Sequence, residues 1–261
     1  MEISSTEYHN KIAQKYDESY TVTFWKFYHD LTWKYIQRFL PENINKSLIL
    51  DAGGGTGIWS IKIAKLGYNI ILTDISKGML SVAKQKIEEE NLTSKIQIVE
   101  SDIINMPEFE NDTFDLILAE GDPISYCSNP ESAVSELSRV CKKNGFVIAS
   151  VDNKITWVKR IFENGNFKEA EKIIETGIAQ MPAENGDFYP AFTFTISELE
   201  NIFAKNNLEV VFQIGKPSFT SPKLLENKTN YDYLLNFELI HSTKKWFADM
   251  GGHIALIGKK I

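Results

Sequence analysis

A run of glycines between two aspartates is the segment whose residue types and spacing point most directly to chemistry. Asp51 ends a short apolar run, Gly53, Gly55 and Gly57 follow it, and Asp74 ends the next apolar run. Glycine lets a strand turn sharply into a helix and lets a ligand approach the backbone. The loop amides and the helix N-terminus then donate hydrogen bonds to that ligand. A carboxylate after the second strand can accept hydrogen bonds from both ribose hydroxyls of a nucleoside.

The spacing of the glycines disfavours a phosphate ligand. A dinucleotide-binding loop needs a third glycine where Ile58 stands, and a triphosphate-binding loop ends in Gly-Lys-Ser/Thr, which is absent after Gly57. Two further acids, Asp102 and Glu120, end the third and fourth apolar runs. Taken alone, Asp102 is explained equally well by a structural role, as a helix cap or loop residue, and by a binding role. Glu120 alone is better explained by the structural role. Together, acids at four successive strand ends predict an acidic crevice that suits an adenosine ligand with a positive centre.

The elements that must position these residues alternate between strand and helix. Apolar runs predict strands over 47–51, 69–73, 95–100, 114–120 and 145–151, and helical periodicity predicts helices over 56–65, 76–91 and 130–143. Such alternation indicates an α/β fold, which we expect to be a Rossmann-like, doubly wound sheet of seven mostly parallel strands with helices on both faces and a helical, aromatic cap. Ser76 is the expected cap of the second helix.

The remaining segments are expected to build on this core within one domain, 1–261. Residues 1–46 are rich in aromatics and predict cap helices, 47–152 form the cofactor-binding core, and 153–195 are a lid insertion in which 154–190 contain no clear strand. Residues 196–261 complete the sheet, with a helix over 197–206, strands over 208–214 and 253–259, and a helical insertion over 222–248. Ser197 and Glu200 are the expected capping box of the helix.

The core resembles the class I S-adenosylmethionine-dependent methyltransferases that act on small molecules. Their glycine motif is matched by Asp51, Gly53, Gly55 and Gly57, their ribose acid by Asp74, their adenine-flanking pair by Asp102 and Ile103, and the start of their fourth motif by Glu120. The resemblance also places Tyr16, Ile75 and Met79 at the cofactor. It covers about residues 8–152, and the run from Glu136 to Gly145 departs from the family pattern only at Cys141, Lys143 and Asn144.

The resemblance implies that S-adenosyl-L-methionine is the cofactor and that its methyl group moves to an acceptor by in-line displacement. We expect a small-molecule acceptor, because the net charge is −7 and only three of the 28 basic residues are arginine, which disfavours nucleic acid. Tyr126 and His241 are the candidate catalytic residues. The candidate pocket residues are Tyr20, Trp25, Ser125 and Tyr189.

Three alternative functions remain open from the sequence. The loop Asp122-Pro123-Ile124-Ser125-Tyr126 resembles the D-P-P-Y motif of nucleic-acid amino-methylating enzymes, which leaves a nucleic-acid or protein methyltransferase as an alternative. A non-catalytic cofactor-binding protein is another. A nicotinamide dehydrogenase is disfavoured by Ile58.

Composition sets the remaining expectations. With 261 residues and 43% hydrophobic residues the chain is of globular type, and no apolar run approaches the ~18 residues of a membrane span. The N-terminus is polar, and Cys127 and Cys141 are the two cysteines. No His-x-Glu or Cys-x-x-Cys spacing indicates a metal site. We therefore expect a cytoplasmic monomer or homodimer with neither a bound metal nor a membrane partner.

Overall fold

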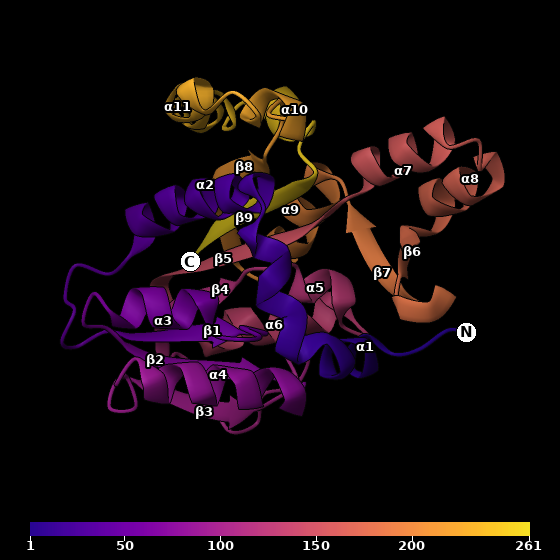
Figure 1. Ribbon diagram of the computed structural model, residues 1–261. Coiled ribbons are helices and arrows are strands. Elements are labelled where there is room, and N and C mark those ends of the chain that lie inside the picture. The colour runs from indigo at the N-terminus through magenta and orange to yellow at the C-terminus, as the bar shows by residue number, and fades with distance from the viewer.

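A mixed nine-stranded sheet forms the centre of the computed structural model, which describes residues 1–261 except for the side chains of Ser19 and Lys228. Its main path runs β3-β2-β1-β4-β5, after which β9 and then β8 follow antiparallel to their neighbours (Figure 1). The seven strands of this path are β1 (Leu48–Ala52), β2 (Asn69–Asp74), β3 (Ile96–Glu100), β4 (Phe114–Ala119), β5 (Cys141–Asn153), β8 (Leu208–Lys216) and β9 (His253–Lys260).

The register of the parallel strands brings their carboxyl ends to one edge. Asp51 in β1 lies opposite Leu72 in β2 and Leu118 in β4, and Asp74 lies opposite Glu100 in β3. The predicted alignment of strand ends is therefore confirmed. Ligands of open α/β sheets bind outside this edge, because the loops there carry side chains from several strands.

Helices cover both faces of the sheet, as the doubly wound prediction requires. One apolar core packs α6 and α9 against one face, and the other packs α2, α3 and α4 against the opposite face. Leu50 belongs to the first core and Ile49 to the second, because successive side chains of a strand point to opposite faces. These helices are α2 (Thr23–Phe39), α3 (Ile58–Ala64), α4 (Lys77–Glu89), α6 (Pro130–Val140) and α9 (Ile196–Lys205).

The segment 154–190 contains a β-hairpin, so the prediction that it holds no strand is wrong. After β5 the chain forms a helical arm and then the hairpin, whose β7 runs parallel to the last residues of β5 at Asp152 and Asn153. The arm projects from the body of the protein beside this hairpin (Figure 1). The elements are α7 (Lys154–Glu163), α8 (Phe167–Thr176), β6 (Ile178–Pro182), η2 (Glu184–Gly186) and β7 (Phe188–Phe194).

Two predicted helix ends also differ from the structure. The helix expected over 130–143 ends at Val140, and Cys141 already pairs with Phe114 in the sheet, where the register shifts before Leu116. The capping box of α9 is formed by Thr195 and Glu198 rather than by Ser197 and Glu200. In contrast, Ser76 caps α4 as predicted, since its hydroxyl accepts from the amide of Met79.

The N-terminal segment reaches across the molecule to the hairpin. It contains α1 (Ser5–Ile12) and η1 (Ala13–Thr21), and the Ile3 amide donates to the Phe188 carbonyl at 2.9 Å. The insertion over 222–248 is mainly helical as predicted, with α10 (Pro222–Leu225), η3 (Lys228–Asn230), α11 (Tyr231–His241) and α12 (Lys245–Ala248). Within the described part of the chain, no helix has the length and apolar character needed to cross a bilayer.

Candidate functional site

The glycine loop is a tight connection between β1 and α3 that only glycine can make. Gly53, Gly55 and Gly57 have φ values of +68°, +57° and +79°, which other residues rarely adopt. A Cβ atom on Gly53 would lie 2.5 Å from the Cβ of Pro123, so the loop is in direct contact with the segment after β4. Above Gly55 a Cβ atom would meet nothing within 4 Å. The loop therefore leaves open space over its backbone at Gly55, where a ligand could lie.

Asp74 holds this loop and the start of α4 together. Its Oδ2 accepts from the Gly55 amide at 2.9 Å, and its Oδ1 accepts from the Ser76 amide at 2.8 Å. Burial raises the pKa of the Asp74 carboxyl, although both amide hydrogen bonds act in the opposite direction. Each carboxylate oxygen can accept a second hydrogen bond, so Asp74 keeps the capacity to bind two hydroxyls of a ligand.

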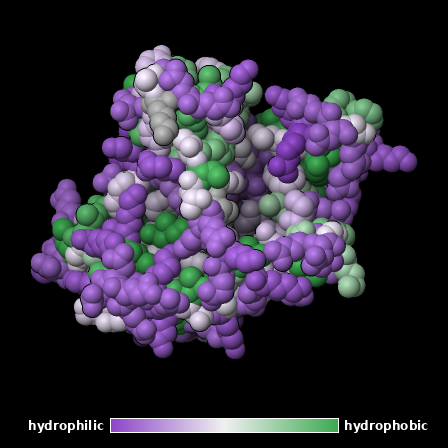
Figure 2. Space-filling view, viewed as in Figure 1, coloured by the Kyte–Doolittle hydropathy of each residue, from purple (hydrophilic) through white to green (hydrophobic). Residues whose placement is uncertain are grey.

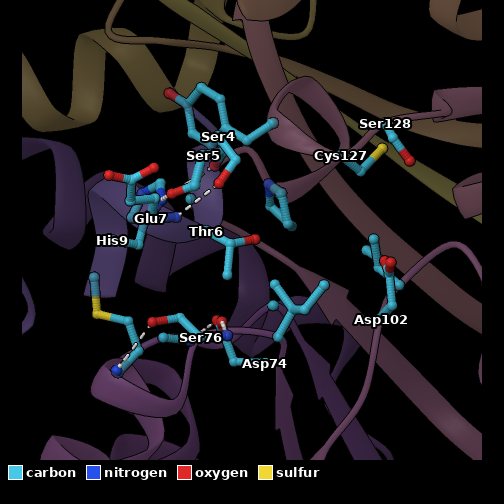
Figure 3. Close-up of a pocket in the computed structure, with 18 of the residues that line it drawn as sticks. Ser4, Ser5, Thr6, Glu7, His9, Asp74, Ser76, Asp102, Cys127 and Ser128 are labelled. Carbon is cyan, nitrogen blue, oxygen red and sulfur yellow. Dashed lines mark hydrogen bonds between the residues drawn. The ribbon is translucent and has the colours of Figure 1, made fainter. Parts of the chain in front are cut away.

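A pocket of about 820 Å³ extends from this loop along the strand ends. Its size lies within the range of about 300–1,000 Å³ that is usual for small-molecule sites. Figure 3 shows residues of α1, among them Ser5 and His9, facing Asp74 and Ser76 across the pocket, with Asp102 and Cys127 on the far side. The predicted residues that line it are Tyr16, Gly53, Gly55, Asp74, Ile75, Met79, Asp102, Ile103 and Tyr126.

The other predicted site residues lie outside the pocket lining, as far as the described residues show. They are Asp51, Gly57, Glu120, Tyr20, Trp25, Ser125, Tyr189 and His241. Asp51 is fully buried and accepts from both the amide and the hydroxyl of Ser60, so it orders the loop beneath the pocket. Burial raises the pKa of its carboxyl to about 6.

Glu120 and His241 have structural partners of their own, away from the pocket. The Glu120 carboxylate accepts from Lys216 Nζ at 2.7 Å and from the Tyr35 hydroxyl at 2.7 Å, and both members of this ion pair are fully buried. His241 ends α11, where its ring packs against Phe237 and Phe247. The structure therefore gives no support for His241 as a base or for Glu120 as a cofactor ligand.

Two segments that are far apart in the sequence form a roof over part of the pocket. Glu2 to Glu7 and His9 line it from the N-terminal side, and Ile178, Pro190 and Phe192 line it from the hairpin. Asn10 fastens α1 to the start of α4, since its Oδ1 accepts from the Gly78 amide at 2.8 Å and lies 2.9 Å from the Ser76 hydroxyl. The roof is thus tied to the same turn that holds Asp74.

Aromatic rings gather at the inner end of the pocket. Tyr126 packs against His9 and Tyr189 with centroids 5.9 and 5.8 Å apart, and Tyr20 packs against Tyr16 and Trp25. Burial raises the pKa of the Tyr126 hydroxyl well above its usual value, so this group keeps its proton near neutral pH.

Figure 2 shows the surface hollowed between the part that carries α2 and α11 and the arm of α7 and α8.

Sequence reasoning missed a cluster that adjoins this aromatic region. Asp122 follows β4, Asp152 lies near the end of β5 and His253 begins β9. His253 Nδ1 lies 2.7 Å from Asp122 Oδ2 and 3.7 Å from Asp152 Oδ1. One ligand atom from each of the three residues lies within 4.8 Å of the others. The three residues are far apart in the chain, so no motif or spacing could have revealed them.

Comparison with known proteins identifies the part of the chain that carries the glycine loop. Residues 49–145 match the family described as a methyltransferase domain. Residues 49–145 therefore carry a methyltransferase domain. This domain supplies the loop, Asp74, Asp102 and Tyr126, whereas both halves of the roof lie outside it.

Two relatives and one solved structure show how far the similarity reaches. The tRNA 5-carboxymethoxyuridine methyltransferase of Escherichia coli K12 is 28% identical over 158 residues, 60% of either chain. A ubiquinone/menaquinone biosynthesis C-methyltransferase of Bartonella tribocorum is 30% identical over 155 residues, 57% of this chain and 56% of that protein. The chain thus matches less than two thirds of the length of these curated relatives.

A Thermotoga maritima crystal structure resembles the chain over almost its whole length. It is described as a methyltransferase dependent on S-adenosylmethionine and a possible histamine N-methyltransferase, and it has a TM-score of 0.62 at 18% identity. The alignment covers 98% of this chain and 99% of that one. The methyltransferase fold, predicted from the residues around Asp51 and Asp74, is therefore confirmed, and the likeness includes the segments outside 49–145.

Proposed function

We propose that the protein transfers the methyl group of S-adenosyl-L-methionine to a small-molecule acceptor. The observation that supports this most is the partly roofed pocket of about 820 Å³, whose lining includes Asp74, Asp102, the glycine loop and Tyr126. A pocket of this size can hold the cofactor and a small acceptor together.

The residues present fit the cofactor at each part of its length. Asp74 would accept from the ribose hydroxyls, Asp102 and Ile103 would border the adenine, and the open space over Gly55 would admit the rest. The carboxylates of Asp74 and Asp102 in the pocket lining favour a cationic ligand.

When bound, S-adenosylmethionine supplies an electrophilic methyl group on a sulfonium centre. The chain's contribution is placement and exclusion of water, which act because a fixed, dry geometry removes the entropic cost of aligning two reactants. The N-terminal segment and the hairpin cover part of the pocket and so reduce its contact with solvent, and Tyr16 and Tyr126 belong to its lining. The hydroxyl of Tyr126 keeps its proton near neutral pH, so it can orient an acceptor as a donor but cannot act as its base.

A nucleic-acid acceptor is the second candidate, because one relative is named as a tRNA methyltransferase. The loop that resembles D-P-P-Y is engaged within the protein, since Asp122 contacts His253 and the Ser125 hydroxyl accepts from the Asp152 amide at 2.9 Å. The net charge of −7 also opposes binding to a polyanion.

We further propose a cytoplasmic place of action, in keeping with the free thiols Cys127 and Cys141.

The test has two stages. Calorimetry with S-adenosylhomocysteine comes first, and the absence of binding would refute the cofactor assignment. Isotope-labelled S-adenosylmethionine is then incubated with the protein and with separated metabolite, RNA and protein fractions of a cell extract. Label in the metabolite fraction is the expected result. Label only in RNA or protein would establish the alternative acceptor class, and tight binding without any transfer would establish a non-catalytic binder.

A further inference from the structure

The cluster of Asp122, Asp152 and His253 has features that the pocket and the fold do not explain. Asp122 and Asp152 are 3% and 2% exposed, yet the second oxygen of each carboxylate, Asp122 Oδ1 and Asp152 Oδ2, makes no hydrogen bond. A buried carboxylate oxygen without a donor is costly, because it has lost water and gained nothing in return. Two such oxygens on carboxylates that converge on one imidazole nitrogen indicate that a ligand with hydrogen-bond donors belongs there.

The charges of the cluster indicate the sign of that ligand. Burial opposes ionisation of His253, but Asp122 and Asp152 outweigh it and raise the pKa of the imidazole. Burial acts likewise on Asp122, but His253 outweighs it and lowers the pKa of that carboxyl. The pKa of Asp152, in contrast, is raised by burial. Asp122 and His253 thus form an ion pair, and Asp152 is the carboxylate without a cation of its own.

The neighbouring cation does not fill this role. Lys216 lies close enough to influence Asp122, but its ammonium group is bonded to Glu120 and lies 4.7 Å from the ring of Tyr28. The other neighbours of Asp152 are neutral, since its Oδ1 accepts from Trp157 Nε1 at 3.0 Å and the Tyr126 hydroxyl lies close enough to lower its pKa. A cation brought by a ligand would therefore complete the cluster.

The surroundings favour an organic cation over a metal ion. The rings of Tyr28 and Trp25 lie 5.3 and 6.2 Å from the His253 ring, and aromatic faces attract organic cations. A metal ion would need the lone pair of His253 Nδ1, the nitrogen that lies 2.7 Å from Asp122 Oδ2, and the raised pKa of this imidazole favours a proton over a metal there. Gly121, Pro123 and Tyr126 line the pocket, whereas Asp122, Asp152 and His253 lie behind this lining, so an acceptor in the pocket would lie next to the cluster.

We propose that Asp122, Asp152 and His253 form the subsite for a protonated amine carried by the methyl acceptor. This inference rests on the proposed function, because it takes the pocket beside the cluster as the place of methyl transfer. The ammonium group lies against Asp152 and Asp122, and the apolar part of the acceptor lies among the aromatic rings. The substrate class is thus a small amine, and a neutral molecule of the same shape is rejected because it leaves the Asp152 charge unpaired.

The test compares amines with neutral molecules of the same shape. The protein is first saturated with S-adenosylhomocysteine, and the binding of this compound is measured by itself, so that failure of the cofactor assignment is recognised separately. A panel of small amines is then titrated by calorimetry, each beside its isosteric alcohol, for example 2-phenylethylamine beside 2-phenylethanol. Binding of at least one amine, about tenfold or more tighter than its alcohol, is expected from the strength of charge-assisted hydrogen bonds.

Variants then assign the discrimination to the cluster. Asp152→Asn keeps the size of the side chain and removes its charge, so amine binding is expected to weaken about tenfold or more while alcohol binding is unchanged. Asp232→Asn, an exposed acid in α11, is the matched control and is expected to bind the amine as the unchanged protein does. Asp122→Asn replaces Asp152→Asn if the latter fails to bind S-adenosylhomocysteine.

Three results would overturn the proposal, and the first needs no variant. One is equal binding of amines and alcohols, or of neither, by unaltered protein that binds S-adenosylhomocysteine. Another is an amine affinity that Asp152→Asn and Asp122→Asn leave unchanged. The third is tight binding of Mg²⁺, Mn²⁺ or Zn²⁺ that is lost in Asp152→Asn, because it would make the cluster a metal site.

Discussion

Replacing Asp74 by asparagine perturbs the proposed ribose site with the smallest possible change of shape. Its two oxygens accept from the amides of Gly55 at 2.9 Å and Ser76 at 2.8 Å. Asparagine offers one oxygen and one NH₂ group, so one of these amides would face a donor instead of an acceptor. A hydrogen bond to a charged group contributes about 1.5–3 kcal/mol, so the loss in unfolding free energy should be about 1–3 kcal/mol.

Asp74→Asn is expected to weaken cofactor binding by more than the loss of one hydrogen bond within the protein would explain. The same substitution removes acceptor capacity toward the two ribose hydroxyls, and losing one such bond weakens binding about tenfold or more. Calorimetry with S-adenosylhomocysteine measures the affinity, and thermal unfolding without ligand measures the stability. The two readouts separate damage to the loop from loss of ligand contacts.

Asp115→Asn provides the matched control for this experiment. Asp115 is also a partly buried carboxylate that accepts from a backbone amide, that of Leu48 at 2.9 Å, and it pairs with Lys142 at 2.8 Å. It lies near the start of β4, at the opposite edge of the sheet from the pocket. A comparable loss of stability with unchanged affinity is expected. An Asp74→Asn protein that folds and binds S-adenosylhomocysteine as tightly as before would refute the ribose assignment.

Three further predictions concern the loop, the roof and the buried ion pair. Because burial raises the pKa of Asp51 to about 6, its stabilising contribution is present below about pH 4 and lost as pH rises. In denaturant titrations, the unfolding free energy of the unaltered protein should therefore fall by roughly 2–3 kcal/mol relative to that of Asp51→Asn between about pH 4 and 7. Parallel pH profiles of unfolding free energy for the two proteins would contradict this. Ile3→Pro removes the amide that donates to Phe188, so S-adenosylhomocysteine should dissociate several-fold faster in stopped-flow measurements than from Ile3→Ala, which keeps that amide; equal rates would exclude a lid role for this contact. Glu120→Gln should cost about 3–5 kcal/mol in urea unfolding because it leaves the Lys216 charge unpaired, and adding Lys216→Met should restore part of that loss unless the pair contributes nothing.

Local signals made the cofactor side of the site predictable. β1 and β2 are short apolar runs that end in acids, and the glycines between Asp51 and α3 have the positive φ values that the tight turn requires. The parallel sheet with helices on both faces followed from strand–helix alternation. Asp74 was therefore placed beside the loop from the sequence alone.

The acceptor side depends on tertiary contacts that leave no local signal. The hairpin of β6 and β7 contains Pro182 and Pro190 and turns through Glu184–Gly186, which reads as a loop in the sequence. It becomes sheet because β7 pairs with the end of β5 and with the N-terminal segment. The cluster of Asp122, Asp152 and His253 is joined in the same way, across three strand ends.

The contact between the first residues and the hairpin also has a consequence for how the protein is made. The Met1 ammonium group pairs with Asp187, 186 positions away, and the Ile3 amide bonds to Phe188. During synthesis residues 1–3 must wait for this distant partner to leave the ribosome, while β1, β2 and β4 can already pair. Contacts of such long separation form late because a large loop must first be closed. In a nascent chain the glycine loop and Asp74 would therefore remain open to solvent, and the N-terminal segment and the hairpin would meet over them only after Phe188 has emerged.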